Sequence, residues 1–104
     1  MRLPGARRKR LRFEWDEDKA ASNVAKHHVA FDEASTVFAD PLAVIFEDEE
    51  HSEHELREII IGHSLFGRLL LVSFTERGDE VVRVISARKA TRRERKDYEE
   101  GTHA

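Results

Sequence analysis

With 104 residues, the chain is long enough for one small domain that builds a core without metals or disulfides. It contains no cysteine, which excludes a disulfide framework, a thiolate nucleophile and a cysteine-ligated zinc site. The net charge of -3 conceals an uneven distribution: residues 2–12 carry six Lys or Arg and no acid, residues 14–80 carry 17 acids against five bases, and residues 83–96 carry seven bases against one acid. A polyanion is therefore expected to bind the ends of the chain rather than its middle.

Membrane and export signals are missing from the sequence. No apolar run reaches the roughly 20 residues that span a bilayer, and the basic start of the chain lacks the apolar segment of a signal peptide. We therefore expect a soluble protein of the cytoplasm with no membrane partner. Residues 1–11 are expected to form a flexible basic tail, either solvated or in contact with RNA, and residues 12–104 a single domain.

The first forty residues are predicted to be mostly helical, after a short strand. Apolar residues alternate with charged ones over residues 11–15, which indicates that strand. Asp16 is a suitable N-cap for a first helix, which ends at the cationic and polar residues 26–28. A second helix is predicted from Asp32 to the Asp40–Pro41 step, because a residue before proline avoids the helical region.

From Leu42 onward the apolar period changes to two, which indicates strands. The expected strands are residues 42–46, 56–63, 68–76 and 81–88, with an acidic loop at 47–55. The short turns around Gly67 and Gly78 favour an antiparallel meander.

Thr91 opens a final basic helix, with Glu94 three residues later as a capping box and Gly101 at its end. The predicted fold class is α+β: two N-terminal helices, an antiparallel sheet of about four strands with the short extra strand at its start, and the C-terminal basic helix. The first helices are expected on one face of the sheet, which leaves the other face for a ligand or partner.

Cations gather on the last strand and the helix after it. Arg83 shares a strand face with the apolar Val81 and Ile85, so its guanidinium needs an anionic partner, either a nearby acid or a ligand phosphate. Arg88 and Lys89 lie at the end of the same strand, where an active site would be exposed. This segment is the predicted binding surface for RNA.

Three separated segments resemble the BrnT family of type II toxins: FEWDEDKAASNVAKHHVAFDEASTVFADP, the hairpin at residues 62–78, and VISARKATRRERKDYEEG. The resemblance covers about residues 12–101 and implies a RelE-like fold. It also implies a ribonuclease that blocks translation and is neutralised by a BrnA antitoxin, a ribbon-helix-helix DNA-binding protein.

Motifs of the BrnT family fall on particular residues of this chain. Its K-H-G helix end matches residues 26–28, its I-S-A-R segment matches 85–88, and its E-R pair and tyrosine match Glu94, Arg95 and Tyr98. His28 stands where the family has a glycine, so we expect a strained left-handed cap or a different helix end there.

RNA can be cleaved without a metal when a base takes the 2′-hydroxyl proton and cations hold the phosphate. Arg83 and Arg88 are the predicted phosphate ligands, because a guanidinium offers a planar fork of donors and keeps its charge. Of the two histidines in ordered segments, His27 and His63, His27 is preferred for proton transfer because it matches the family motif. The alternative is that His27 only ends the first helix. Further RNA contacts are predicted at Arg68, Arg77, Lys89, Arg92, Arg95 and Lys96.

Tyr98 lies four residues after Glu94, on the same side of the last helix. As a fourth candidate catalytic residue, it would orient the arginines or stack on a base. The alternative is structural, with the tyrosine ring packed on the sheet and Glu94 acting only as a cap.

No metal or cofactor is expected. His51 and His54 in the acidic loop have a composition that suits a divalent ion, but two loop histidines three residues apart define no ligand geometry. Two other functions stay open: a nucleic-acid-binding or antitoxin-binding module such as a co-repressor, and a folded but catalytically silent toxin. The sequence lacks a helix-turn-helix spacing, so operator DNA would be bound only through the antitoxin.

The partners implied by the resemblance are the BrnA-like antitoxin and an RNA target, with ribosome-bound mRNA as one candidate. The expected assembly is a heterotetramer, in which a toxin dimer is bridged by two antitoxins.

Overall fold

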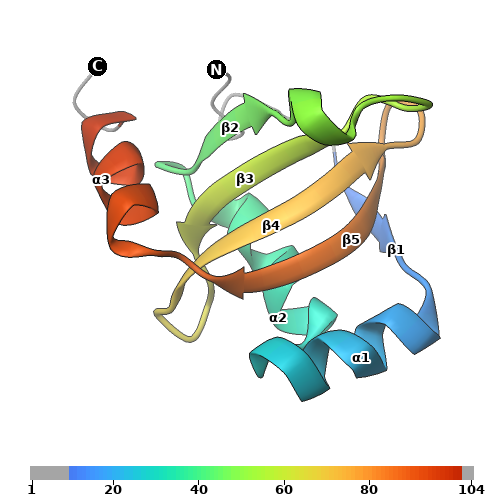
Figure 1. Ribbon diagram of the computed structural model, residues 1–104, viewed down its shortest axis with the longest axis horizontal. Coiled ribbons are helices and arrows are strands. Elements are labelled where there is room, and N and C mark those ends of the chain that lie inside the picture. Colours follow the sequence, from blue (N-terminus) through green and yellow to red (C-terminus); the bar gives the residue numbers. More distant parts are fainter. Residues whose placement is uncertain (1–9, 102–104) are drawn as a thin grey trace.

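The computed structural model describes residues 10–101, so most of the predicted tail lies outside the described residues. The elements follow in the order β1 (Arg12–Glu14), α1 (Glu17–His27), α2 (Phe31–Thr36), β2 (Val44–Glu47), β3 (Glu58–His63), β4 (Leu69–Glu76), β5 (Val81–Lys89) and α3 (Arg92–Gly101), as Figure 1 shows. Short 3₁₀ turns at Val37–Ala39 and Glu49–His51 follow α2 and β2. The predicted α+β class is confirmed, with the short N-terminal strand included in a five-stranded sheet.

The strands are ordered β1-β5-β4-β3-β2. Strands β2 to β5 form the predicted antiparallel meander, whereas β1 pairs with β5 in parallel. β1 and β5 can pair in parallel because a long stretch of chain connects them, beginning with α1 and α2. This connection allows β5 to run beside β1 in the same direction.

A β-bulge interrupts the pairing of β4 with β5. Ser73 pairs with Ser86 while Phe74 pairs with Val84, so Ile85 is an extra residue in β5. The extra residue shifts the alternation of side chains by one position in the second half of the strand. Val82, Val84 and Ala87 therefore all face one apolar core.

The main core fills the space between one sheet face and the two N-terminal helices. Its buried residues include Phe31 and Val37 from the helical segment and Ile60, Val72 and Phe74 from the sheet. Burial of each such side chain stabilises the fold by about 1.5–3 kcal/mol. Figure 1 shows α2 behind the sheet on this side.

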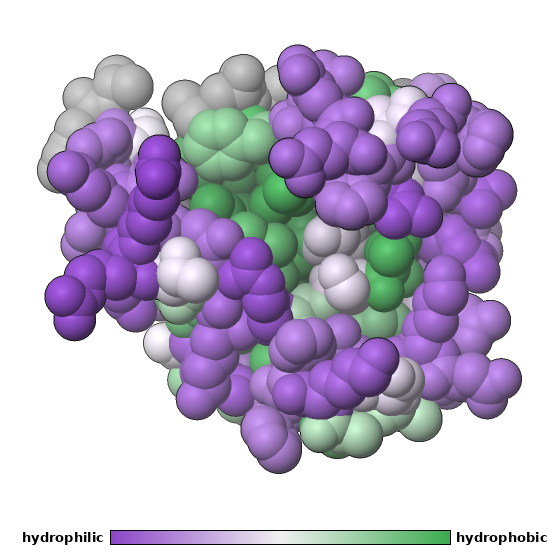
Figure 2. Space-filling view, viewed as in Figure 1, coloured by the Kyte–Doolittle hydropathy of each residue, from purple (hydrophilic) through white to green (hydrophobic). Residues whose placement is uncertain are grey.

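The opposite sheet face is only partly covered, by α3. Tyr98 of α3 packs with Val44, Ile61, Leu69 and Leu71 in a second apolar cluster. Figure 2 shows apolar side chains still visible between α3 and the polar segment after β2. The prediction that this face is left for a ligand or partner therefore applies only to the part that α3 does not cover.

The N-terminus of α1 follows the predicted capping. Asp16 accepts a hydrogen bond from the backbone N–H of Lys19 at 3.0 Å. At the other end His28 adopts φ 58° and ψ 33°, and its N–H donates to the carbonyl of Val24 at 2.9 Å. A left-handed conformation is unfavourable for a residue with a Cβ, so the expected strained left-handed cap is present at His28.

A buried asparagine fixes α1 against β5. The Asn23 amide donates to the carbonyls of Val29 and Ala87 at 2.9 and 2.8 Å, and its oxygen accepts from the N–H of Ala87 at 3.1 Å. These bonds satisfy both backbone groups of Ala87, two residues after the bulge, so the strand is held where it carries Arg88.

Candidate functional site

A carboxylate at the end of the second helical segment connects three distant parts of the chain. Asp40 Oδ2 accepts hydrogen bonds from the backbone N–H of His63 at 2.8 Å and from the hydroxyl of Tyr98 at 2.9 Å. Its other oxygen accepts from the N–H of Leu42 at 2.9 Å. Asp40 therefore fixes both the end of β3 and the middle of α3.

His63 and Tyr98 are in direct contact on the face that carries α3. His63 Nδ1 lies 3.1 Å from the Tyr98 hydroxyl, and the rings meet edge to face with centroids 5.1 Å apart. Burial, and then the bond to Asp40, raise the pKa of Tyr98 to about 12, so the hydroxyl keeps its proton near neutral pH.

The single hydroxyl proton determines the direction of this chain of hydrogen bonds. Because Tyr98 donates to the Asp40 carboxylate, its oxygen acts as acceptor for His63, and the His63 hydrogen is placed on Nδ1. In the neutral ring, this tautomer leaves His63 Nε2 with a lone pair that can accept a proton. The His63 side chain is 42% exposed, so a ligand can reach it.

Arg88 and Glu94 form a two-pronged ion pair beside this cluster. Arg88 Nη1 and Nη2 donate to the two carboxylate oxygens at 2.7 and 2.8 Å. The hydrogen bonds to Arg88 are the main cause that lowers the pKa of Glu94, and the same bonds raise the pKa of Arg88. Glu94 also accepts from the N–H of Thr91 at 2.9 Å, which confirms the predicted capping box.

Helix α3 is thus fixed to the sheet at two points one turn apart. Glu94 forms an ion pair with Arg88 of β5. Tyr98 forms hydrogen bonds with His63 of β3 and with Asp40. Both contacts are polar and lie beside the second apolar cluster, to which Tyr98 contributes its ring.

Arg83 and Arg88 lie on the same face of the sheet. Arg83 pairs across the strands with Thr75 and Arg88 with Leu71, and these two β4 residues are separated by an even number of positions. Arg83 Nη1 lies 3.7 Å from Glu14 of β1, a loose and half-exposed contact. Arg83 is therefore the less firmly held of the two predicted phosphate ligands.

His27 is not brought together with these arginines. It belongs to α1, which packs against the sheet face that carries Ala87, whereas Arg88 points to the opposite face. Sequence reasoning preferred His27 because it matches a family motif, and it missed the pairing of Asp40 with His63. These two residues and Tyr98 belong to separate elements, so no local spacing could have revealed the cluster.

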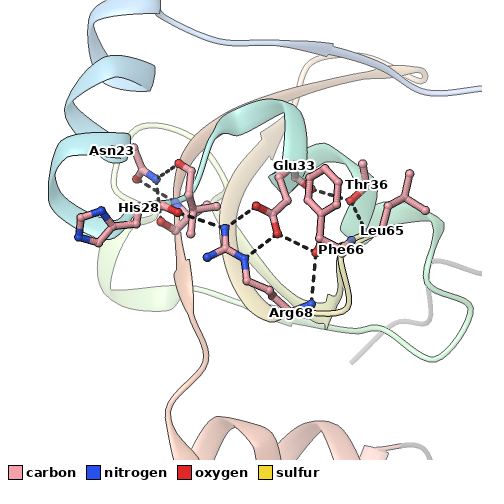
Figure 3. A network of polar contacts seen from close by, with 10 residues as sticks. Asn23, His28, Glu33, Thr36, Leu65, Phe66 and Arg68 are labelled. Atoms are coloured by element: carbon pink, nitrogen blue, oxygen red, sulfur yellow. Dashed lines mark hydrogen bonds and ion pairs between the residues drawn. The ribbon is translucent and has the colours of Figure 1, made fainter.

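Arg68 has a structural role on the helix-covered side of the sheet. Its guanidinium donates to both carboxylate oxygens of Glu33, through Nε at 2.8 Å and through Nη2, and also to the carbonyl of His28 at 3.1 Å. Figure 3 shows this network. The bond from Arg68 is the largest cause that lowers the pKa of Glu33, which is otherwise raised by burial. The predicted RNA contact at Arg68 stays a prediction, and a phosphate there would have to share the guanidinium with Glu33.

The other predicted cations are spread around the domain. Arg77 lies in the turn between β4 and β5, and its Nη2 is 3.9 Å from a carboxylate oxygen of Glu55. Lys89 is on the Glu33 side, where its charge helps to lower the pKa of that carboxyl. Arg92, Arg95 and Lys96 are on α3, and Lys96 lies 4.0 Å from Glu100.

The acidic loop has its own internal contacts. His51 Nδ1 lies 3.0 Å from Asp48 Oδ2. Among residues 10–101, no three His, Asp or Glu side chains are grouped so that they could hold a metal ion. None of the helices in this part of the chain is long and apolar enough to cross a membrane.

Comparisons with known proteins agree with this architecture. The family model for "Ribonuclease toxin, BrnT, of type II toxin-antitoxin system" matches residues 15–94. The crystal structure of the Brucella abortus ribonuclease toxin BrnT is similar, with a TM-score of 0.62 and 27% sequence identity over 79% of this chain and 99% of that one. A search of curated proteins finds no significant match. Because the family model spans most of the chain, this protein belongs to the family of BrnT ribonuclease toxins of type II toxin-antitoxin systems.

Proposed function

We propose that the chain is an endoribonuclease that cleaves RNA by attack of a 2′-hydroxyl, without a metal. The observation that carries this proposal is the exposed His63 ring, oriented by Tyr98 and Asp40 on the sheet face that also carries Arg83 and Arg88. A proton acceptor and phosphate-binding cations on one surface meet the requirements of this reaction.

In this mechanism each group has one task. His63 Nε2 accepts the proton of the 2′-hydroxyl, whose oxygen attacks the adjacent phosphorus. Arg88 donates hydrogen bonds to the phosphate oxygens as their charge increases. Arg83 lies about 13 Å farther along the sheet, opposite Thr75 rather than Leu71, so it would hold a neighbouring phosphate of the same RNA strand. The 5′-oxygen leaves and takes a proton from solvent, which yields a 2′,3′-cyclic phosphate. Tyr98 and Asp40 are positioning residues, because they act through His63 rather than on the RNA.

The ion pair between Arg88 and Glu94 bears on the silent-toxin alternative. Arg88 uses both terminal nitrogens on Glu94, so a phosphate must share or displace that carboxylate. The guanidinium is half-exposed and keeps its charge, so this exchange requires rotation of a side chain rather than a change of fold. If the exchange does not occur, the protein binds its antitoxin and cleaves nothing.

Family membership supports a proposal for the cellular role. Cleavage of mRNA blocks translation in the cytoplasm, and a BrnA-type ribbon-helix-helix antitoxin neutralises the toxin and binds the operator DNA. The uncovered apolar part of the α3 face, which includes Phe46 and Ile59, supports an antitoxin contact there. Two antitoxins bridging a toxin dimer would complete a heterotetramer.

An expression test separates the toxin from its alternatives. The wild-type chain, Arg88→Ala and His63→Ala are induced without antitoxin, and growth, amino-acid incorporation and RNA integrity are followed. We expect growth arrest with broken RNA only from wild type, while circular dichroism shows that all three chains fold. A folded wild type that leaves growth and RNA intact would support the silent toxin or the binding module instead.

A further inference from the structure

Two large apolar side chains project from the turn between β3 and β4. Leu65 and Phe66 are each 78% exposed, which makes them the most exposed large apolar residues in the described part of the chain. Neither contributes to the two apolar clusters. Their exposure therefore needs an explanation other than stability.

The turn that carries them is held rigidly. Leu65 N–H donates to Thr36 Oγ1 at 2.9 Å, Phe66 N–H donates to Ser64 Oγ at 3.2 Å, and Gly67 N–H donates to the Ser64 carbonyl at 2.9 Å. Ser64 Oγ in turn donates to the buried Glu33 at 2.8 Å, the carboxylate that also binds Arg68 (Figure 3).

Gly67 has φ +79°, so the turn uses a backbone conformation that suits glycine. The hydrogen bonds and this conformation fix the backbone that carries Phe66. An aromatic ring on a fixed backbone loses little conformational entropy when it binds a ligand.

The turn lies at the same end of the sheet as the candidate site. Phe66 follows His63 by three residues, so the backbone between them spans at most about 10 Å. Ala90 N–H donates to the carbonyl of Leu69 at 2.9 Å, which brings the start of α3 with Arg92 and Arg93 to this end of the sheet. Figure 1 shows the turn near the connection from β5 to α3.

We propose that Phe66 is a stacking platform for a base of single-stranded RNA, next to the nucleotide whose phosphate is cleaved. This inference rests on the proposed ribonuclease function and adds a substrate-binding residue to it. Stacking on one aromatic ring is a single-residue contact, which suits an exposed side chain with cations nearby. A protein partner would need roughly 800 Å² on this surface, far more than two side chains supply.

The experiment measures binding separately from cleavage. The probe is a short mixed-sequence 2′-O-methyl RNA, which lacks the attacking hydroxyl and stays intact. Its affinity for wild type, Phe66→Ala, Phe66→Trp and the matched control Leu65→Ala is measured by fluorescence anisotropy. An abasic oligonucleotide with the same backbone is the second probe, because it offers phosphates without bases.

We expect Phe66→Ala to weaken binding of the base-containing probe by roughly 5- to 100-fold, whereas Leu65→Ala changes it by less than about twofold. All variants should bind the abasic probe equally, because only the base contact is removed. Phe66→Trp should retain affinity, and its added indole fluorescence should be quenched by the base-containing probe.

The outcomes distinguish this inference from the function on which it rests. If wild type cleaves RNA and Phe66→Ala binds and cleaves equally well, the stacking role is refuted while the ribonuclease stands. If Phe66→Ala keeps RNA affinity but loses binding to the antitoxin, the turn is a protein contact. If folded wild type neither binds nor cleaves RNA, both proposals fail.

Discussion

Arg83 and Arg88 point to the same face of β5 although they are five positions apart. In a regular strand an odd separation places two side chains on opposite faces. The bulge at Ile85 adds one residue between them, so both side chains point to the same face. Their cross-strand partners in β4 are Thr75 and Leu71. A ligand that lies across this surface can therefore meet both guanidinium groups, once it shares or displaces Glu94 at Arg88.

This shared face predicts the effect of removing Arg83. Arg83→Ala should weaken binding of the 2′-O-methyl RNA and lower the slope of log affinity against log salt by about 0.7, the value for one phosphate contact on a single strand. Anisotropy titrations at several salt concentrations measure the slope. Lys19→Ala is the control, since Lys19 is an exposed cation of α1, which packs on the opposite face of the sheet. Equal slopes for Arg83→Ala and wild type would exclude the phosphate contact.

Tyr98→Phe tests the hydrogen-bond chain through Asp40 and His63. The ring stays packed, so we expect a loss of only about 1–2 kcal/mol in the free energy of unfolding. His63 loses the acceptor that fixes its Nδ1 hydrogen, so kcat should fall by about tenfold or more, with KM nearly unchanged. Urea unfolding and steady-state cleavage provide the two numbers. Full cleavage activity in a folded Tyr98→Phe variant would reduce Tyr98 to a packing residue.

Gly62→Ala should disturb the same site from within the fold. A Cβ on Gly62 would lie 2.8 Å from Ala43 Cβ, 3.0 Å from Val37 Cγ1 and 3.1 Å from Asp40 Oδ2. Relief of these contacts should cost about 1–3 kcal/mol of stability and move the carboxylate that orients Tyr98. Thermal unfolding and cleavage assays should both show the effect. Unchanged stability would mean that β3 and the Asp40 segment leave room for an added methyl group at Gly62.

The ion pair between Glu33 and Arg68 predicts a dependence of stability on pH. Because Arg68 lowers the pKa of Glu33 in the folded chain, the unfolded chain binds more protons in acid. The stabilisation is present above the usual carboxyl pKa of 4.5 and is lost as pH falls below it.

Glu33→Gln isolates this contribution. At pH 7 we expect the variant to be less stable by roughly 1–3 kcal/mol, because Arg68 keeps its charge and loses its anionic partner. The gap from wild type should shrink as the pH falls from 5 to 3. Asp32→Asn, a change at an exposed acid of the same helix, is the control. A gap that is constant with pH would rule out the ion pair as its source.

Most of the fold could be predicted from the sequence, because its signals are local. Period-two apolar residues indicated the meander, Asp16 and Thr91 marked two helix starts, and the Asp40–Pro41 step marked the end of the second helical segment. Each of these signals depends on a few neighbouring residues. The parallel pairing of β1 with β5 was beyond such reasoning, since it joins residues about seventy positions apart.

The candidate site was less predictable, because it depends on contacts between distant elements. The Arg88 position could be inferred from charge, but its pairing with Glu94 reflects the path of the chain from β5 into α3. Arg68 looked like a free surface cation until the fold brought Glu33 to it. The bulge at Ile85 has no glycine or proline to mark it, so the common face of Arg83 and Arg88 could not be predicted.

Cleavage of RNA by the purified chain, with analysis of the new ends, decides whether the chain is a metal-free ribonuclease. Wild type, Arg88→Ala and His63→Ala are incubated with single-stranded RNA in the presence of EDTA, after circular dichroism has shown that each is folded. We predict that wild type cuts the RNA and leaves 2′,3′-cyclic phosphates, and that both variants lose at least about 100-fold in rate. Cleavage that needs a divalent metal, or equal rates in His63→Ala and wild type, would contradict a metal-free reaction with His63 as the base.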